Sequence, residues 1–148
     1  PGDLLVLREG TAEGRLLGGC LSILAAAAGT PWALRPDPEG TILFLEDVDE
    51  KPYKVDRMLL QLRSSGAFEG VRAVVFGDMK GCNPPASAEF TLEDVIHESL
   101  AGLEIPVVLG LSSGHVTGPN VTLPLGVRAR LRCHDDEARF EVLEPSVA

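Results

Sequence analysis

Three short, almost uninterrupted apolar runs constrain the fold of this chain more than any other feature. They occupy residues 41–45, 71–76 and 105–109 and are dominated by Val, Ile, Leu and Phe. Such runs are typical of strands buried on both faces of a sheet. Segments with apolar residues at helical spacing separate them. Alternating buried strands and helices predict an α/β fold with parallel strands at its centre.

Three segments have the pattern of helices. Residues 21–28 are rich in alanine and precede Gly29, a residue common just past a helix end. Residues 55–62 place apolar side chains on one face. A third helix is expected to begin at Thr91, with Asp94 three residues later as a weak capping box. About three helices should therefore flank the sheet.

The two ends of the chain show shorter, alternating patterns. The segment at 4–7 predicts a buried strand, and 14–19 a turn or a short strand. Beyond residue 120 the alternation favours strands, with a hairpin turn at 134–137. These C-terminal strand-like segments are 121–124, 127–132 and 139–143. We therefore expect residues 1–148 to form one α/β domain with a mixed sheet and a C-terminal antiparallel ribbon.

Charge and composition exclude several classes of function. The 148 residues include 13 basic and 22 acidic side chains, for a net charge of -9, and 45% are hydrophobic. A nucleic-acid binder needs a basic surface, and so does a protein that docks on anionic lipid. No apolar run approaches the roughly 20 residues that cross a bilayer. Nucleotide-binding and metal-protease motifs are also absent from the sequence, so we expect no cofactor and no metal.

Cysteine usage points to a reducing compartment. Cys20, Cys82 and Cys133 are odd in number, widely spaced and contain no C-x-x-C pair. This pattern predicts free thiols, as in a cytoplasmic protein.

Glu46 and His115 each follow a predicted strand, at 41–45 and 105–109. Functional groups in open α/β sheets gather at the carboxyl ends of the strands. Glu46 should be partly buried, and a buried carboxylate is costly unless it is paired. From local features alone, however, a loop histidine that makes a structural hydrogen bond is the commoner arrangement. Asp47 also competes with Glu46 for any role in orienting the histidine.

Several segments together resemble the C-terminal domain of the LD-carboxypeptidase family, in family order. These are serine peptidases that remove the terminal D-alanine from murein tetrapeptides, and some relatives confer immunity to a peptide-nucleotide antibiotic. The matching segments are Gly18-Gly19-x-Leu21, Gly29-Thr30-Pro31, residues 42–47, parts of 52–62, Gly77-Asp78, Gly114-His115, and Asn120-x-Thr122-Leu123-Pro124-x-Gly126.

The resemblance implies a two-domain enzyme. An N-terminal domain would carry the nucleophilic serine, and a swivelling β/β/α C-terminal domain would supply the glutamate and histidine. Glu46 and His115 match those two positions. His115 would act as general base and then general acid, while Glu46 would hold its tautomer. The implied partners are the N-terminal domain, a murein peptide and a second copy in a homodimer.

The nucleophile itself is expected to lie outside this chain. None of the serines sits in a Gly-x-Ser-x-Gly-like elbow, and Ser113 is too close in sequence to His115 to face it productively. The chain also begins without methionine and enters almost at once into the strand-like segment 4–7. We expect a domain cut from a longer protein, inactive by itself.

Four further residues are candidates for binding or supporting the site. Asp47 is the first. Asp78 is the second, and the sequence favours a substrate contact and a turn cap equally for it. Arg57, beside Asp56, is expected in a surface ion pair more than in the site. Asn120 is expected to hydrogen-bond the backbone of the His115 loop. His97 and His134, in contrast, should be solvated.

Two departures from the family pattern bear on specificity. Cys20 stands where relatives usually have asparagine, and residues 116–119 lengthen the loop after His115. Two alternatives also stay open, one suggested by the immunity-type relatives and one by the absent serine. The first is a family member that hydrolyses a peptidyl nucleotide, with Trp32 as a thinly supported stacking residue. The second is a non-catalytic binding module.

Overall fold

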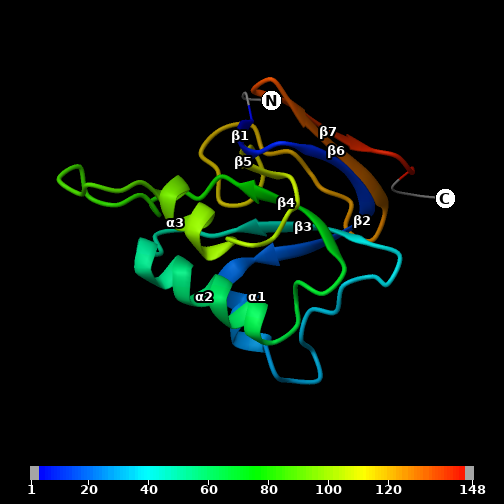
Figure 1. Cartoon of the computed structure of the whole chain (residues 1–148), viewed down its shortest axis with the longest axis horizontal. Coiled ribbons are helices and arrows are strands. Elements are labelled where there is room, and N and C mark those ends of the chain that lie inside the picture. Colours follow the sequence, from blue (N-terminus) through cyan, green and yellow to red (C-terminus); the bar gives the residue numbers. More distant parts are fainter. Residues whose placement is uncertain (1–3, 146–148) are drawn as a thin grey trace.

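The computed structural model describes residues 4–145 and contains seven strands and three helices (Figure 1). In chain order the elements are β1 (Leu5–Arg8), β2 (Gly10–Cys20), α1 (Leu21–Ala27), β3 (Thr41–Glu46), α2 (Pro52–Ser64), β4 (Val71–Gly77), α3 (Leu92–Ser99), β5 (Val107–Leu111), β6 (Arg128–His134) and β7 (Glu137–Val142). The predicted α/β class, with a mixed sheet, three helices and a C-terminal antiparallel ribbon, is confirmed.

All seven strands belong to one sheet, in the order β1-β5-β4-β3-β2-β6-β7. Strands β2, β3, β4 and β5 run parallel, while β1, β6 and β7 pair antiparallel with their neighbours. The sheet is strongly curved, and its two edge strands, β1 and β7, approach each other (Figure 1). All three helices lie on the same side of the sheet (Figure 1).

The curved sheet separates two hydrophobic cores. Leu43 and Leu45 of β3 pack with the apolar faces of the helices in one core. Ile42 and Phe44 point to the opposite face and pack with side chains of β5 and β6 in the other. Successive side chains of a strand alternate between faces, so both faces of β3 must be apolar. This is why residues 41–45 read as a continuous apolar run.

The largest difference from the sequence prediction is β2. Residues 14–19 were expected to be a turn or short strand, yet β2 extends over 11 residues. Its first half pairs with β6 and its second half, from Arg15 to Cys20, with β3. The glycines of β2 hide its strand character because glycine is disfavoured in strands. A Cβ atom at Gly18 would overlap the carbonyl oxygen of Phe44, so glycine allows the two strands to come together here.

Smaller differences affect element ends and one predicted strand. β5 begins two residues later than expected, and α3 ends at Ser99. Residues 121–124 alternate like a strand but lie in the loop between β5 and β6. Within residues 4–145, no helix has both the length and the apolar character required to cross a membrane.

The adjacent glycines of β2 provide a matched test of this packing. Both have unusual backbone angles, with φ of 139° at Gly18 and 152° at Gly19, but a Cβ atom at Gly19 would meet nothing within 4 Å. Gly18→Ala should therefore lower the free energy of unfolding by about 2 kcal/mol more than Gly19→Ala, because only the former overpacks. Urea titrations of the two variants measure the difference. Equal losses would show that backbone strain, not contact with β3, sets the requirement.

Candidate active site

The carboxyl ends of the central strands bring the candidate residues to one edge of the sheet. Glu46 is the last residue of β3, Asp78 follows the last residue of β4, and His115 lies in the loop after β5. These three strands are parallel neighbours, so their ends lie side by side. Asp78 joins the His115 loop directly, through a 3.4 Å hydrogen bond from its backbone N–H to the carbonyl of Ser113.

Glu46 and His115 meet through one carboxylate oxygen. Nδ1 of His115 lies 2.8 Å from Oε2 of Glu46, and the backbone N–H of His115 donates to the same oxygen at 3.2 Å. An ionised carboxylate only accepts hydrogen bonds, so the proton of a neutral imidazole resides on Nδ1 and leaves Nε2 as a base. The Glu46 side chain is 8% exposed and that of His115 is 54% exposed. The pair therefore has a buried acceptor and an accessible imidazole.

Two glycines make this contact possible. Gly114 adopts φ +105°, and a Cβ atom there would overlap Oε2 of Glu46. At Gly77 a Cβ atom would lie 2.5 Å from the carbonyl oxygen of Ser113 and 2.9 Å from Cβ of Glu46. Any side chain at either position would push the carboxylate away from the imidazole.

The loop that carries His115 is held by its own hydrogen bonds. The side-chain amide of Asn120 donates to the carbonyl of Gly114 at 2.9 Å, the contact expected from the sequence. Ser112 donates through its hydroxyl to the carbonyl of Pro119 at 2.6 Å and accepts from the N–H of Val121 at its own carbonyl. These contacts close residues 112–121 into a compact turn around the histidine.

Asp47 lies on the other face of the sheet from Glu46. It is 2% exposed, and Oδ2 accepts a 2.8 Å hydrogen bond from the backbone N–H of Ser22, in the first turn of α1. Oδ1 accepts from the N–H of Val48 at 2.9 Å. Both oxygens therefore have backbone partners, and Asp47, the residue after β3, serves as a cap for the first turn of α1. The competition with Glu46 is thus resolved in favour of Glu46 as the histidine's partner.

Arg57 and Asp56 do not form the surface ion pair expected from the sequence. The Arg57 guanidinium lies over the ring of Tyr53, 5.1 Å from its centroid. Asp56 instead accepts from the hydroxyl of Ser99 in α3 at 3.0 Å. The prediction failed because both side chains found partners outside their own pair. Within residues 4–145, Arg57 forms no hydrogen bond or ion pair with Glu46 or His115, and its binding role stays a prediction.

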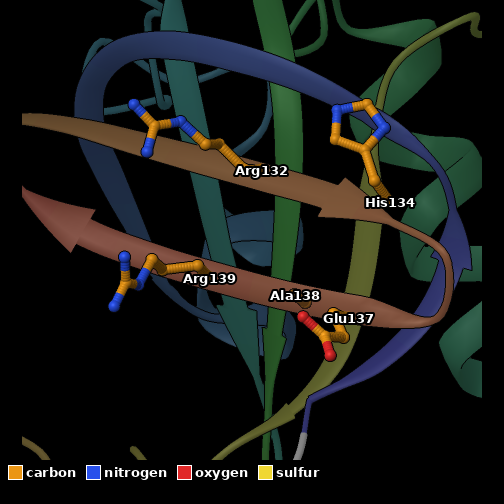
Figure 2. A pocket seen from close by; sticks show the side chains of 5 residues that line it. All are labelled: Arg132, His134, Glu137, Ala138 and Arg139. Atoms are coloured by element: carbon orange, nitrogen blue, oxygen red, sulfur yellow. The ribbon is translucent and has the colours of Figure 1, made fainter.

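The hollows formed by the described residues include one beside Glu46 and one remote from it. The hollow beside Glu46 has a volume of about 400 Å³, and its wall includes Ser113, Thr122 and Leu123. Thr122 and Leu123 were noted in the sequence only as part of a family motif, and no role was predicted for them. The remote hollow, of about 480 Å³, lies on the β6–β7 ribbon, where Arg132 of β6 is the register partner of Arg139 of β7 (Figure 2). It shares no residue with the Glu46 site.

The remaining histidine and cysteine side chains are not arranged as a metal centre. His134, expected to be solvated, is exposed and also lies 3.0 Å from the hydroxyl of Thr11. Burial raises the pKa of the Cys82 thiol and raises the pKa of Cys133 to about 11, so both favour the unreactive thiol form. Within residues 4–145, no group of three or more His, Cys, Asp or Glu side chains could hold a metal ion.

The helix cap made by Asp47 gives a test that separates the two neighbouring carboxylates. Asp47→Ala should lower the free energy of unfolding by about 1–2 kcal/mol, because the first turn of α1 loses a buried acceptor. Asp47→Asn, which keeps one acceptor oxygen, should cost less. The downfield Nδ1–H proton signal of His115 should persist in both variants. Loss of that signal in folded Asp47→Ala would contradict the separation of roles.

Comparison with known proteins matches residues 13–131 to the model of the LD-carboxypeptidase C-terminal domain. The murein tetrapeptide carboxypeptidase of Pseudomonas aeruginosa is 40% identical over 70% of this chain and 33% of its own length. The microcin C7 self-immunity protein MccF of Escherichia coli is 35% identical over 81% of this chain and 34% of its own length. The chain spans about two fifths of the length of the curated relatives it matches.

Solved structures agree with these matches. The muramoyltetrapeptide carboxypeptidase of Oxalobacter formigenes superimposes with a TM-score of 0.80 at 38% identity, over 93% of this chain and 48% of that one. MccF in complex with glutamyl sulfamoyl guanosine superimposes with a TM-score of 0.79 at 30% identity, over 98% of this chain and 42% of that one. The family model matches most of this chain, and the fold agrees with that of a solved relative. This chain therefore belongs to the family of LD-carboxypeptidase C-terminal domains.

Proposed function

We propose that this chain is the C-terminal domain of a cytoplasmic serine LD-carboxypeptidase, which releases the terminal D-alanine of murein tetrapeptides during recycling of cell-wall peptides. The observation that carries the proposal is the 2.8 Å contact between Nδ1 of His115 and Oε2 of Glu46. This is the base and its orienting carboxylate, two thirds of a Ser-His-Glu triad. Similarity to murein tetrapeptide carboxypeptidases supports the substrate class.

In the proposed mechanism the imidazole moves protons and the carboxylate holds the imidazole. A serine hydroxyl from the N-terminal domain attacks the carbonyl carbon of the L,D-peptide bond as Nε2 of His115 takes its proton. His115 then gives this proton to the nitrogen of the departing D-alanine, and the acyl group remains on the serine. Water then attacks the acyl carbon as Nε2 of His115 takes its proton, and His115 returns this proton to the serine oxygen when the acyl–serine bond breaks. Glu46 stabilises the imidazolium that forms in each half-reaction.

The serine domain is proposed to dock on the edge of the sheet where His115 lies. More than half of the His115 side chain is exposed, so a serine on a second domain can approach it. Relatives more than twice the length of this chain have room for such a domain. That domain would also supply the donors that stabilise the oxyanion. We further propose that the complete enzyme is a homodimer, which its sedimentation behaviour would test.

The triad assignment is tested in an enzyme assembled from this chain and the N-terminal nucleophile domain. His115→Ala should lower D-alanine release by roughly 10⁶-fold, because the serine loses its base. Glu46→Gln should lower D-alanine release by roughly 10⁴-fold, because the glutamine would hold the imidazole in the wrong tautomer. His97→Ala, on the exposed side of α3, is the matched control and should leave the rate unchanged. Full activity in His115→Ala, or in the isolated chain, would sink the assignment.

A peptidyl nucleotide is the second candidate substrate, favoured by similarity to MccF at 35% sequence identity. Trp32 gives this candidate little support. It is 84% exposed in the loop that connects the end of α1 to the start of β3, whereas Glu46 lies at the other end of β3. Trp32 also does not line the hollow beside Glu46.

Measuring kcat/KM for a murein tetrapeptide and for a peptidyl-adenylate analogue decides between the two substrates. We expect the assembled enzyme to prefer the tetrapeptide, and Trp32→Ala to change neither value. A preference for the nucleotide that Trp32→Ala removes would establish the second candidate. No turnover of either compound, with both domains folded and associated, would favour a non-catalytic binding module.

A further inference from the structure

The hollow beside Glu46 plays no part in the proton transfers described above. It lies between the ends of β2 and β3 and the loop that follows β5, and its wall does not include His115. Its volume of about 400 Å³ is within the range of small-molecule sites, roughly 300–1,000 Å³. The space is therefore adjacent to the reacting groups and large enough for part of a peptide.

Two buried polar side chains in this wall have unused hydrogen-bonding capacity. Glu46 is 6% exposed, and both of its hydrogen bonds from His115 go to Oε2. Its other oxygen, Oε1, accepts no hydrogen bond from residues 4–145 and is not among the fully buried unpaired atoms, so it retains access to the hollow. Ser113 is also 6% exposed; within the same residues its hydroxyl makes no hydrogen bond, and it too is not among the fully buried unpaired atoms. Both atoms are therefore open to the hollow, where a ligand that donates hydrogen bonds could reach them.

Charge decides which kind of ligand can enter. Glu46 is the single formally charged side chain in the wall of the hollow, which contains no lysine or arginine. A carboxylate or phosphate placed here would face the Glu46 charge without a compensating cation. Phe44 and Leu123 contribute apolar surface to the same wall. The hollow therefore suits a positively charged donor carried on an aliphatic stem.

We propose that this hollow binds an aliphatic ammonium group of the peptide substrate. The ammonium would donate to Oε1 of Glu46 and to the hydroxyl of Ser113, while its stem packs on Phe44 and Leu123. Oε2 would remain with His115, so one carboxylate would both orient the base and anchor the substrate. The ammonium-binding property stands on the structure alone, whereas its assignment to a substrate rests on the proposed function. The C-terminal carboxylate of that substrate must then bind a cation outside the hollow.

Titration of the chain with n-butylammonium, followed by ¹H–¹⁵N chemical shifts, tests the binding. We expect saturable shifts at the amides of Ser113, Gly114 and Thr122. Butyrate, of similar length and opposite charge, should bind at least about tenfold more weakly, and butan-1-ol should fall between them. Butyrate binding as well as butylammonium, or no saturable shift with either probe, overturns the proposal.

Variants locate the binding in the hollow. Ser113→Ala removes one acceptor with little change of shape and should weaken butylammonium binding about fivefold. Leu123→Trp fills the hollow and should abolish binding. Leu143→Trp is the control: Leu143 is 38% exposed, lies just past β7 and has no place in the wall. Unchanged affinity in folded Ser113→Ala and Leu123→Trp would show that butylammonium binds elsewhere.

A substrate experiment separates this inference from the proposed function. In the assembled enzyme, acetylation of a side-chain amine on the tetrapeptide should raise KM about tenfold and leave kcat nearly unchanged. If butylammonium binds the hollow but no D-alanine is released, the proposed function fails and the site remains. If D-alanine is released but butylammonium does not bind and acetylation has no effect, the inference fails and the proposed function remains.

Discussion

The hydrogen bond between the carboxylate of Glu46 and the imidazole of His115 sets the requirements that the surrounding structure meets. It joins residues 69 positions apart, so it can form only where the ends of β3 and β5 are neighbours of β4 in a parallel arrangement. It also needs space, which the missing side chains of Gly77 and Gly114 provide. A buried carboxylate without this partner would carry a large desolvation cost, so the contact stabilises the fold as well as preparing a base.

The end of β3 separates a residue of the candidate site from a residue that stabilises a helix. Glu46, the last residue of β3, and Asp47, which follows it, point to opposite faces of the sheet. Glu46 belongs to the face that meets β5, β6 and the His115 loop, whereas Asp47 belongs to the face that the helices cover. The same side-chain class thus does two jobs one residue apart: one carboxylate orients an imidazole, and the other caps the first turn of α1. An acidic stretch that looks like a solvated loop in the sequence therefore begins with two buried residues.

The sequence was sufficient to predict an element of the fold where its residue pattern had one physical explanation. The apolar runs at 71–76 and 41–45 are strands because no other element is buried on both faces at that length. The pairing of Glu46 with His115 was implied by the family resemblance, and the position of each residue after a predicted strand was consistent with it. Strand β2 was underestimated because its glycines are chosen for backbone approach to Phe44, a long-range contact that leaves no local signal. Arg57 was misjudged because Tyr53, one turn earlier, competed successfully with Asp56 for it. The hollow could not be predicted because its wall combines three separate parts of the chain: Gly19, residues 44–46 and residues 113–125.

The two adjacent carboxylates also protect the sheet against misalignment. If β3 slipped by one residue along β2 and β4, every side chain would change faces, as alternation requires. Asp47 would then point toward the imidazole with a shorter reach, and Glu46 would be driven into the apolar layer beneath the helices. Such an offset conformer would lose its helix cap and its base together. Two adjacent residues therefore favour the correct alignment of β3: Asp47 through the stability of α1, and Glu46 through its hydrogen bond with His115.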